Sequence, residues 1–166
     1  MFFLQHHRLG ALFRVALSVG LRLGEATGLK WCDVDLNTGP IKVRRQLRRG
    51  RADLLVEQSL KTEASRRDIV LPASCVQELQ RHYTRQLEAR LKAGDEWVDR
   101  SPADEYVFTT YRPRKGGQVG GPLHPRNVLR AFHRVCDKAG GRRCGFTTYA
   151  TARRCCSSIE VVRWLM

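Results

Sequence analysis

Apolar residues recur every three or four positions near the start of the chain, and this spacing predicts a helix over Leu9–Val19. Gly20 follows the last apolar residue, and glycine is a common helix stop at that place. A second, shorter helix is expected over Gly24–Trp31, with Glu25 in its first turn, where a carboxylate interacts favourably with the helix dipole. The chain therefore opens with two consecutive helices.

The period then changes from helical to alternating. Ile41–Arg44 alternates apolar and basic residues, which is typical of a strand with one exposed, cationic face. The turn-forming residues Asn37–Pro40 precede it. Leu54–Val56 and Asp68–Leu71 are two further strand candidates, and Pro72 closes the last one. Three short strands with tight connections predict an antiparallel meander.

Helical spacing returns after the third strand. It runs over Ser74–Leu91, and Gly94 ends that helix. Tyr106–Phe108 is short and extended, and Pro125 stands where a first-turn proline favours a last helix. The apolar positions of the last helix are Val128, Leu129, Phe132, Val135 and Cys136. The expected fold class is α+β, with helices around a small three-stranded antiparallel sheet.

The composition adds a strong positive charge. Lys and Arg number 30 against 16 Asp and Glu, so the net charge is +14 and the pI is about 10.3. An excess of this size favours a polyanionic partner, and a nucleic-acid backbone is the commonest one. Charge alone leaves DNA, RNA, an anionic membrane surface and simple solvation of an arginine-rich protein open.

Other features disfavour membrane and metal classes. The longest apolar stretch, Leu9–Val19, contains Arg14, is too short to span a bilayer and lacks the flanks of a signal peptide, so no membrane partner is expected. No C-x-x-C pair occurs, so we expect reduced thiols in a cytoplasmic protein, without a metal site. The cysteines are Cys32, Cys75, Cys136, Cys144, Cys155 and Cys156.

One motif near the start carries a resemblance to a known family. It consists of Gly20–Ala26 (GLRLGEA), Leu29–Trp31 (LKW) and Asp33–Asp35 (DVD), in this order. The motif resembles the first conserved box of the tyrosine recombinases, or phage integrases. In that box an arginine opens a short helix, and a Trp-x-Asp-Val-Asp segment leads into a β-meander.

Two later segments extend the resemblance. Lys61–Pro72 resembles the strand-turn-strand segment that carries the family's active-site lysine, and Pro122–Gly140 more weakly resembles the helix before the family's second box. The resemblance covers roughly Leu9–Gly140, which is most of the chain. It implies part of an integrase-type catalytic domain.

The resemblance implies a chemistry for two residues. Family members attack a DNA phosphodiester with a tyrosine hydroxyl and form a phosphotyrosyl link, without a cofactor or a small-molecule substrate. Arg22 would be the first of two arginines that stabilise the charge on the phosphate oxygens. Lys61, at a hairpin tip, would protonate the leaving 5′ oxygen as general acid. The alternatives are a surface arginine and an ordinary turn lysine.

Double-stranded DNA is the partner that the resemblance implies, and it suggests a nucleoid-associated protein. The arginines on and after the first strand are either a solvated face or a hairpin that follows the DNA backbone. The expected DNA-binding set is Arg44, Arg45, Arg48, Arg49, Arg51 and Arg66. Full-length family members assemble as tetramers on DNA, which we do not expect of this chain.

The family pattern breaks after Gly140. The His-x-x-Arg pair, a later His or Trp and the nucleophilic Tyr do not follow in order, and Tyr149 lacks the expected context. When the codons of Cys144–Ala152 are read from one base earlier, a suitable choice of the free bases gives Val-Arg-Phe-His-Asp-Leu-Arg-His-Ser-Ala. This string contains the family's second box, His-Asp-Leu-Arg-His. We therefore expect a frameshift between about Gly140 and Arg143.

This interpretation divides the chain into a partial catalytic domain over residues 1–142 and an aberrant tail over residues 143–166. The family's N-terminal DNA-clamping domain and the start of the catalytic domain would also be missing. Without the helix of the second box, Leu12 and Phe13 should be partly uncovered.

The favoured hypothesis is a catalytically inactive recombinase remnant with residual DNA binding. The first alternative is a stand-alone DNA-binding regulator that occupies recombination sites without cutting. The second is a basic RNA-associated protein, and the motifs around Arg22 and Lys61 argue against it.

Overall fold

The computed structural model describes residues 7–51, 54–60, 65–98, 101, 104–111 and 118–138. The tail expected over residues 143–166 lies outside this part, and so does Lys61. The helices are α2 (Gly10–Val19), α3 (Leu23–Thr27), η1 (Trp31–Asp33), α4 (Ala73–Ala93), η4 (Gly94–Glu96) and α5 (Pro125–Lys138). The strands are β1 (Pro40–Val43), β2 (Arg45–Arg49), β3 (Leu55–Ser59) and β4 (Arg67–Val70).

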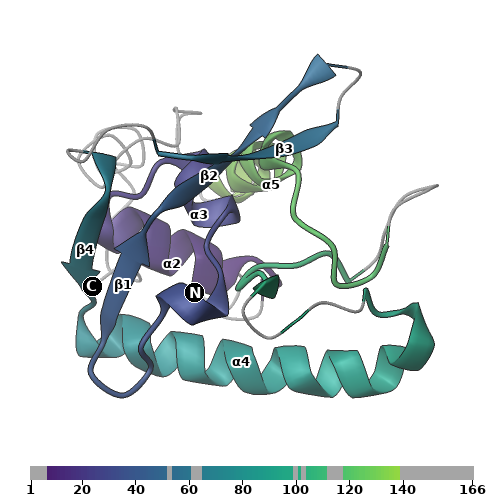
Figure 1. Cartoon of the computed structure of the whole chain (residues 1–166), viewed down its shortest axis with the longest axis horizontal. Helices are drawn as coiled ribbons and strands as arrows, with labels where there is room; N and C mark the ends of the chain where they lie inside the picture. Colours follow the sequence, from purple (N-terminus) through teal and green to yellow (C-terminus); the bar gives the residue numbers. More distant parts are fainter. Residues whose placement is uncertain are drawn as a thin grey trace.

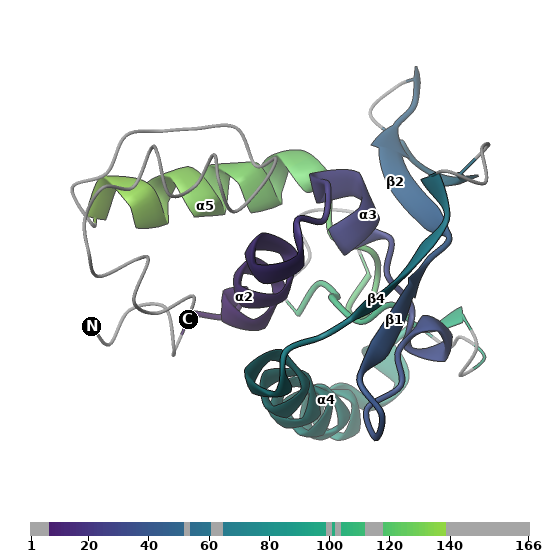
Figure 2. The same cartoon turned by 90° about the vertical axis from the view of Figure 1, so that its left-hand side faces the viewer.

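These elements form layers around α2, and the expected α+β class is confirmed (Figure 1). Figure 2 shows α5 on one side of α2 and the strands on the other, with α4 below both. Over the described residues, no helix is long and apolar enough to cross a membrane.

Helix α2 forms the centre of the core, because apolar side chains cover most of its surface. Gly20 ends it in the left-handed conformation, with φ 69°, as the sequence predicts. The expectation that Leu12 and Phe13 are partly uncovered is wrong, since they are 0% and 1% exposed. The ring of Phe132 in α5 lies 5.5 Å from that of Phe13, so α5 contributes to this cover.

Helix α3 is shorter than the helix expected over Gly24–Trp31. It ends at Thr27, and the single 3-10 turn η1 follows. Between them, Lys30 is extended and pairs with Tyr106 in an isolated β-bridge, while the N–H of Val107 donates to the carbonyl of Leu29 at 2.9 Å. This tertiary pairing takes the chain out of the helix.

The three expected strands appear as four, because the first one changes partner at Arg44. Before this residue β1 pairs with β4, with Ile41 opposite Ile69. After it β2 pairs with β3, with Leu47 opposite Glu57. Both pairings are antiparallel, but β1 pairs with β4 and β2 with β3, so two connected two-stranded ribbons, the β1–β4 ribbon and the β2–β3 ribbon, replace the expected meander.

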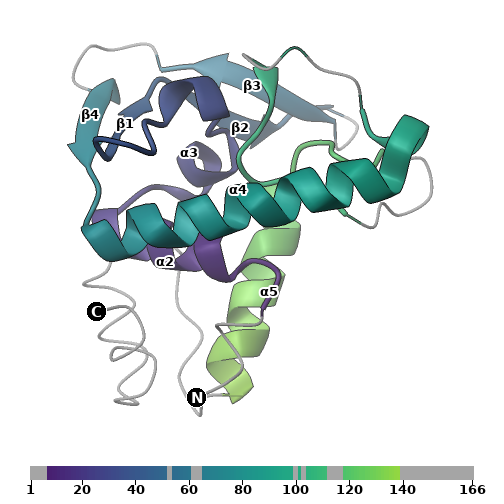
Figure 3. The same cartoon turned by 90° about the horizontal axis from the view of Figure 1, so that it is seen from below.

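Helix α4 crosses the molecule below the strands and α2 (Figure 3). Its buried side is Cys75, Leu79, His82 and Gln86. The Gln86 amide ties it to two other segments, since Oε1 accepts a bond from the Trp31 indole at 3.2 Å and Nε2 donates to the Tyr106 carbonyl at 3.0 Å. Helix α4 thereby holds the segments on either side of the Lys30–Tyr106 bridge.

Candidate functional site

A buried carboxylate joins two arginines at the start of α3. Glu25 is 2% exposed. Arg22, the N-cap residue, donates to it through its backbone N–H at 2.9 Å and through Nη1 at 3.0 Å. Arg67 of β4 donates through Nη1 at 3.2 Å and Nη2 at 2.8 Å, which is a bidentate pair. We call these three residues the arginine site.

The arginine site keeps a positive charge. Burial alone would raise the pKa of Glu25, but hydrogen bonds from Arg67 and Arg22 outweigh it, so the pKa lies below its ordinary value. One ionised carboxylate therefore faces two guanidinium groups. The side chain of Arg22 is 68% exposed and that of Arg67 is 30% exposed, so both are accessible from solvent. Such a site can bind an anion, and a phosphodiester fits the planar donors of guanidinium.

The segment of Lys61 begins and ends close to the arginine site. On the near side, the N–H of buried Leu60 donates to the carbonyl of Arg44 at 3.0 Å. On the far side, Arg66 donates through Nε to the carbonyl of Leu60 at 3.1 Å, and Arg67 follows it directly. Leu60 and Arg66, which flank the Lys61 segment, are thus hydrogen-bonded to each other, and Arg66 is followed directly by Arg67 of the arginine site.

Two of the six arginines in the expected DNA-binding set are occupied by carboxylates. Arg44 lies 2.8 Å from Asp68. Arg45 is 21% exposed and pairs through Nη1 with Asp33 and through Nε with Glu57. These ion pairs hold strands to each other and to η1, so the two side chains have a structural task.

The other four arginines of the set are exposed. Arg48, Arg49 and Arg51 lie on β2 and just past its end, whereas Arg66 flanks the Lys61 segment. Beside β2, a cleft opens toward the first turn of α5. Its lining residues are Leu47, Arg48, Arg49, His124, Pro125 and Arg126.

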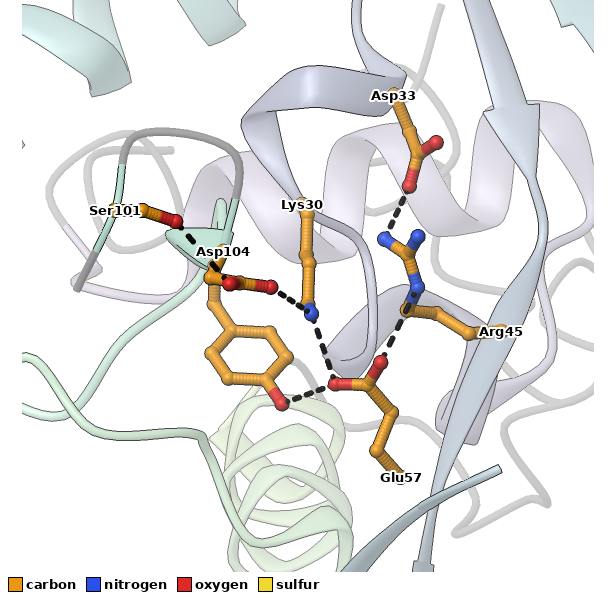
Figure 4. Close-up of polar contacts among 7 residues, drawn as sticks. Lys30, Asp33, Arg45, Glu57, Ser101 and Asp104 are labelled. Carbon is orange, nitrogen blue, oxygen red and sulfur yellow. Dashed lines mark hydrogen bonds and ion pairs between the residues drawn. The ribbon is translucent and has the colours of Figure 1, made fainter. Parts of the chain in front are cut away.

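A second charged cluster joins the β2–β3 ribbon to the body of the molecule (Figure 4). The side chain of Lys30 is 8% exposed, and its Nζ lies 3.1 Å from Glu57 Oε2 and 2.9 Å from Asp104 Oδ1. Glu57 also accepts a bond from the hydroxyl of Tyr106 at 2.7 Å. With Arg45 and Asp33 these residues form what we call the Lys30 network.

Glu57 is ionised at the centre of this network. Partial burial would raise its pKa, but the hydrogen bonds from Tyr106 and Lys30 and the charges of Lys30 and Arg45 lower it below the ordinary value. The Lys30 network therefore contains a real ion pair between the body and β3.

Sequence reasoning misses Arg67 as a site residue, although one signal for it exists. Strand β4 alternates, with Arg67 and Ile69 half-buried and Asp68 and Val70 exposed. Arg67 thus shares its side of the strand with an apolar residue, which is unusual for an arginine without a partner. Its partner Glu25 is 42 residues away, and no periodic pattern indicates that pairing.

The sequence model of the phage integrase family matches residues 4–158. A "Tyrosine recombinase XerC-like" protein of Caldanaerobacter subterraneus subsp. tengcongensis is 34% identical over 145 residues, which cover 82% of this chain and 35% of the relative. An integrase of Streptomyces ambofaciens is 36% identical over 136 residues, which cover 76% of this chain and 30% of the relative. The chain therefore spans about a third of the length of these curated relatives.

Solved structures share the fold. A Tn1549 transposon integrase in complex with a circular intermediate DNA has a TM-score of 0.61 at 21% identity, over 83% of this chain and 41% of that one. The crystal structure of XerA recombinase has a TM-score of 0.51 at 20% identity, over 82% of this chain and 37% of that one. At these identities the similarity establishes the architecture.

Proposed function

Because the chain belongs to the phage integrase family, we propose that it is an incomplete recombinase catalytic domain that binds double-stranded DNA and does not cleave it. The observation that carries the proposal is the arginine site, in which a buried Glu25 holds Arg22 at the start of α3. Because Glu25 already orders this guanidinium, binding a phosphate costs little additional side-chain entropy. Lys61, the proposed general acid, belongs to the segment whose flank continues into this site.

The proposed DNA surface consists of the arginine site and the exposed face of the β2–β3 ribbon. Arg48, Arg49, Arg51 and Arg66 would contact phosphates, together with the cleft beside α5. Arg44 and Arg45 would support this surface from behind, because carboxylates already pair with them. The Tn1549 integrase was solved in complexes with DNA, which supports the same class of partner here.

The proposed loss of cleavage rests on the codons after Gly140. In the frame one base earlier, each codon joins the last base of one original codon to the first two bases of the next. For the pair Cys155–Cys156 the shifted codon is TTG or CTG, and both encode Leu. For the pair Arg154–Cys155 the shifted codon ends in TG and encodes Leu, Val or Met. The shifted frame thus continues with two apolar residues, whatever the codon usage.

Apolar residues soon after His-Asp-Leu-Arg-His are what a helix entering the core would need. We therefore propose residues 1–142 as the partial catalytic domain and residues 143–166 as a frame-shifted tail. The nucleotide sequence across the Gly140 codon tests this directly. Codons that do not give His-Asp-Leu-Arg-His in the earlier frame would show that the tail is the native coding sequence.

DNA binding is tested by titrating a labelled duplex at increasing salt. We expect affinity to fall by roughly a decade or more over a few-fold rise in salt, since several arginine–phosphate contacts release counterions. Arg48→Ala on the ribbon should weaken binding, whereas the control Lys92→Ala, which removes an exposed charge on α4, should not. Binding that is absent, or that does not depend on salt, would contradict the proposal.

A stand-alone regulator that occupies DNA sites is the second candidate. One observation favours it: Leu12 and Phe13 are buried, so no apolar patch is left open over α2. A regulator should discriminate between duplexes of different sequence, whereas a remnant should bind them alike. Competition between unrelated duplexes separates the two candidates.

A further inference from the structure

The β2–β3 ribbon has little core of its own. Among the described residues of its two strands, Leu47 alone is fully buried. Figure 1 shows the ribbon extending away from the helices. Because an isolated two-stranded ribbon is marginally stable in water, its direction must be set where it joins the body.

Strand β2 joins the body along a line of backbone contact with α3. A Cβ atom added at Gly24 would lie 2.7 Å from the carbonyl oxygen of Leu47, and one added at Gly28 would lie 3.0 Å from its nitrogen. These two glycines, one turn apart, let the strand rest directly on the helix. The contact fixes the position of β2 at Leu47, but β3 is on the other side of the ribbon and needs its own attachment.

That attachment is the Lys30 network. Glu57 of β3 receives Lys30 Nζ at 3.1 Å, the hydroxyl of Tyr106 at 2.7 Å and Arg45 Nε at 3.4 Å. Its partners thus come from three separate segments of the chain. Figure 4 shows the carboxylate of Glu57 between the Lys30 ammonium and the Arg45 guanidinium.

We propose that Lys30 is a positioning residue that sets the direction of the β2–β3 ribbon through its ion pair with Glu57. Burying the Lys30 ammonium is costly, and the Glu57 side chain is 36% exposed, so their ion pair adds little net stability compared with apolar residues of similar size. What the pair supplies is a specific geometry between the body and β3. The proposal rests on the proposed DNA binding only for its functional consequence, since ribbon direction can be measured without DNA.

A small change of direction at the base is large at the tip. From Leu47, which lies opposite Glu57, to Arg51 an extended chain would cover about 13 Å, at roughly 3.3 Å per residue. A tilt of about 10° at this base would therefore displace the tip by about 2 Å, which is enough to break a hydrogen bond. Arg48, Arg49 and Arg51 would then lose their alignment with successive phosphates.

The test separates geometry from stability by replacing both partners. In the double variant Lys30→Met and Glu57→Met, Arg45 keeps Asp33, and Asp104 keeps a bond from Ser101 at 3.1 Å. We expect Tm to stay close to that of the parent, because removing both charges leaves none unpaired at the centre. Residual dipolar couplings of the β2 and β3 amides, fitted in the frame of α4, should show a rotated or broadened ribbon.

DNA affinity should fall about fivefold or more in the double variant, with a shallower salt dependence. The matched control is the double variant Glu88→Met and Lys92→Met, since it also removes one charge of each sign, from exposed positions of α4 away from the ribbon. Glu57→Gln is nearly isosteric and should rotate the ribbon in the same sense. This single variant still tests the proposal if the double variant of Lys30 and Glu57 does not fold.

Two outcomes decide the matter. Couplings identical to those of the parent in both Glu57 variants would overturn the positioning role of Lys30. A parent chain that does not bind duplex DNA would instead refute the proposed function, and the couplings would still test the role of Lys30.

Discussion

At the scale of single residues, the carboxylate nearest to each arginine decides what that arginine does. Arg45 and Arg48 are three positions apart on one strand and look alike in the sequence. Arg45 pairs with Asp33 and Glu57 at 21% exposure, whereas Arg48 is exposed and bonds the amide of Gln58 at 3.4 Å. Charge patterning in a sequence therefore finds the basic strand but does not separate its structural arginines from its accessible ones.

Arg48→Ala and Arg45→Ala should have opposite signatures. Loss of Arg48 should leave Tm unchanged and lower the slope of log affinity against log salt by about one, since one phosphate contact is lost. Loss of Arg45 should lower Tm, because it leaves Asp33 without this partner at 9% exposure. Thermal melts and salt titrations of both variants check this. Equal effects on both measurements would contradict the division of the set.

Glu25→Gln should remove an acid-sensitive part of the stability. The folded-state pKa of Glu25 is lowered, chiefly because hydrogen bonds from Arg67 and Arg22 outweigh burial, so the ionised form favours the folded state. This contribution is complete above the unfolded pKa of about 4.5 and is lost as the pH falls through the lower folded value.

Melting curves of parent and variant between pH 7 and pH 3 measure this effect. The gap in Tm should be widest at neutral pH and should narrow in acid. Glu88→Gln on the exposed side of α4 is the control. A gap that stays constant over this range would contradict the role given to Glu25.

At the scale of elements, local spacing predicted the long helices but not the points where tertiary contacts interrupt them. Helix α2 ends at Gly20 and α4 at Gly94, as the sequence predicts, because the stop signals are local. The early end of α3 and the partner change at Arg44 depend on Tyr106 and on β4, which are distant in sequence. Likewise, the motif around Arg22 can be recognised from consecutive residues in the sequence, whereas its contact with Arg67 through Glu25 cannot.

Gly24→Ala tests the contact between α3 and β2. In an unconstrained helix the change would stabilise by up to about 1 kcal/mol through helix propensity. Here the new Cβ would lie 2.7 Å from the carbonyl oxygen of Leu47, so we expect destabilisation of about 1–3 kcal/mol. The sign of the change in unfolding free energy, measured by urea unfolding, shows whether helix propensity or the steric contact with Leu47 dominates. Faster amide exchange should appear in β2, and Gln77→Ala at an exposed position of α4 should not cause it.

At the scale of the whole molecule, the net charge of +14 is distributed unevenly between structural and accessible positions. Carboxylates hold Arg44, Arg45 and Lys30 at the junction of the strands and the body. Exposed arginines lie on the β2–β3 ribbon and around the arginine site, and also on α4 and α5. The accessible positive charge is therefore spread over several elements, which suits an elongated polyanion better than a compact ligand.

The chain should form no covalent adduct with nicked or suicide DNA substrates. Tyr106 is only 4% exposed, and burial raises the pKa of Tyr111, so neither is a ready nucleophile. Tyr83 packs edge-on against Trp31 at 4.8 Å, and Tyr149 lies outside the described residues. Denaturing gels with labelled DNA measure adduct formation. A covalent band that maps to any of the four tyrosines would contradict the proposed loss of cleavage.

The ribbon that rests on Gly24 and Gly28 has a consequence for how such a chain can diverge. Past Leu47, its strands bury no further residue completely, so the connection between the two strands can accept insertions or deletions without repacking the interior. The length of the β2–β3 ribbon along a ligand can therefore differ between related proteins, while packing constrains the interior sequence. For protein engineering, the same connection is a place to graft a peptide.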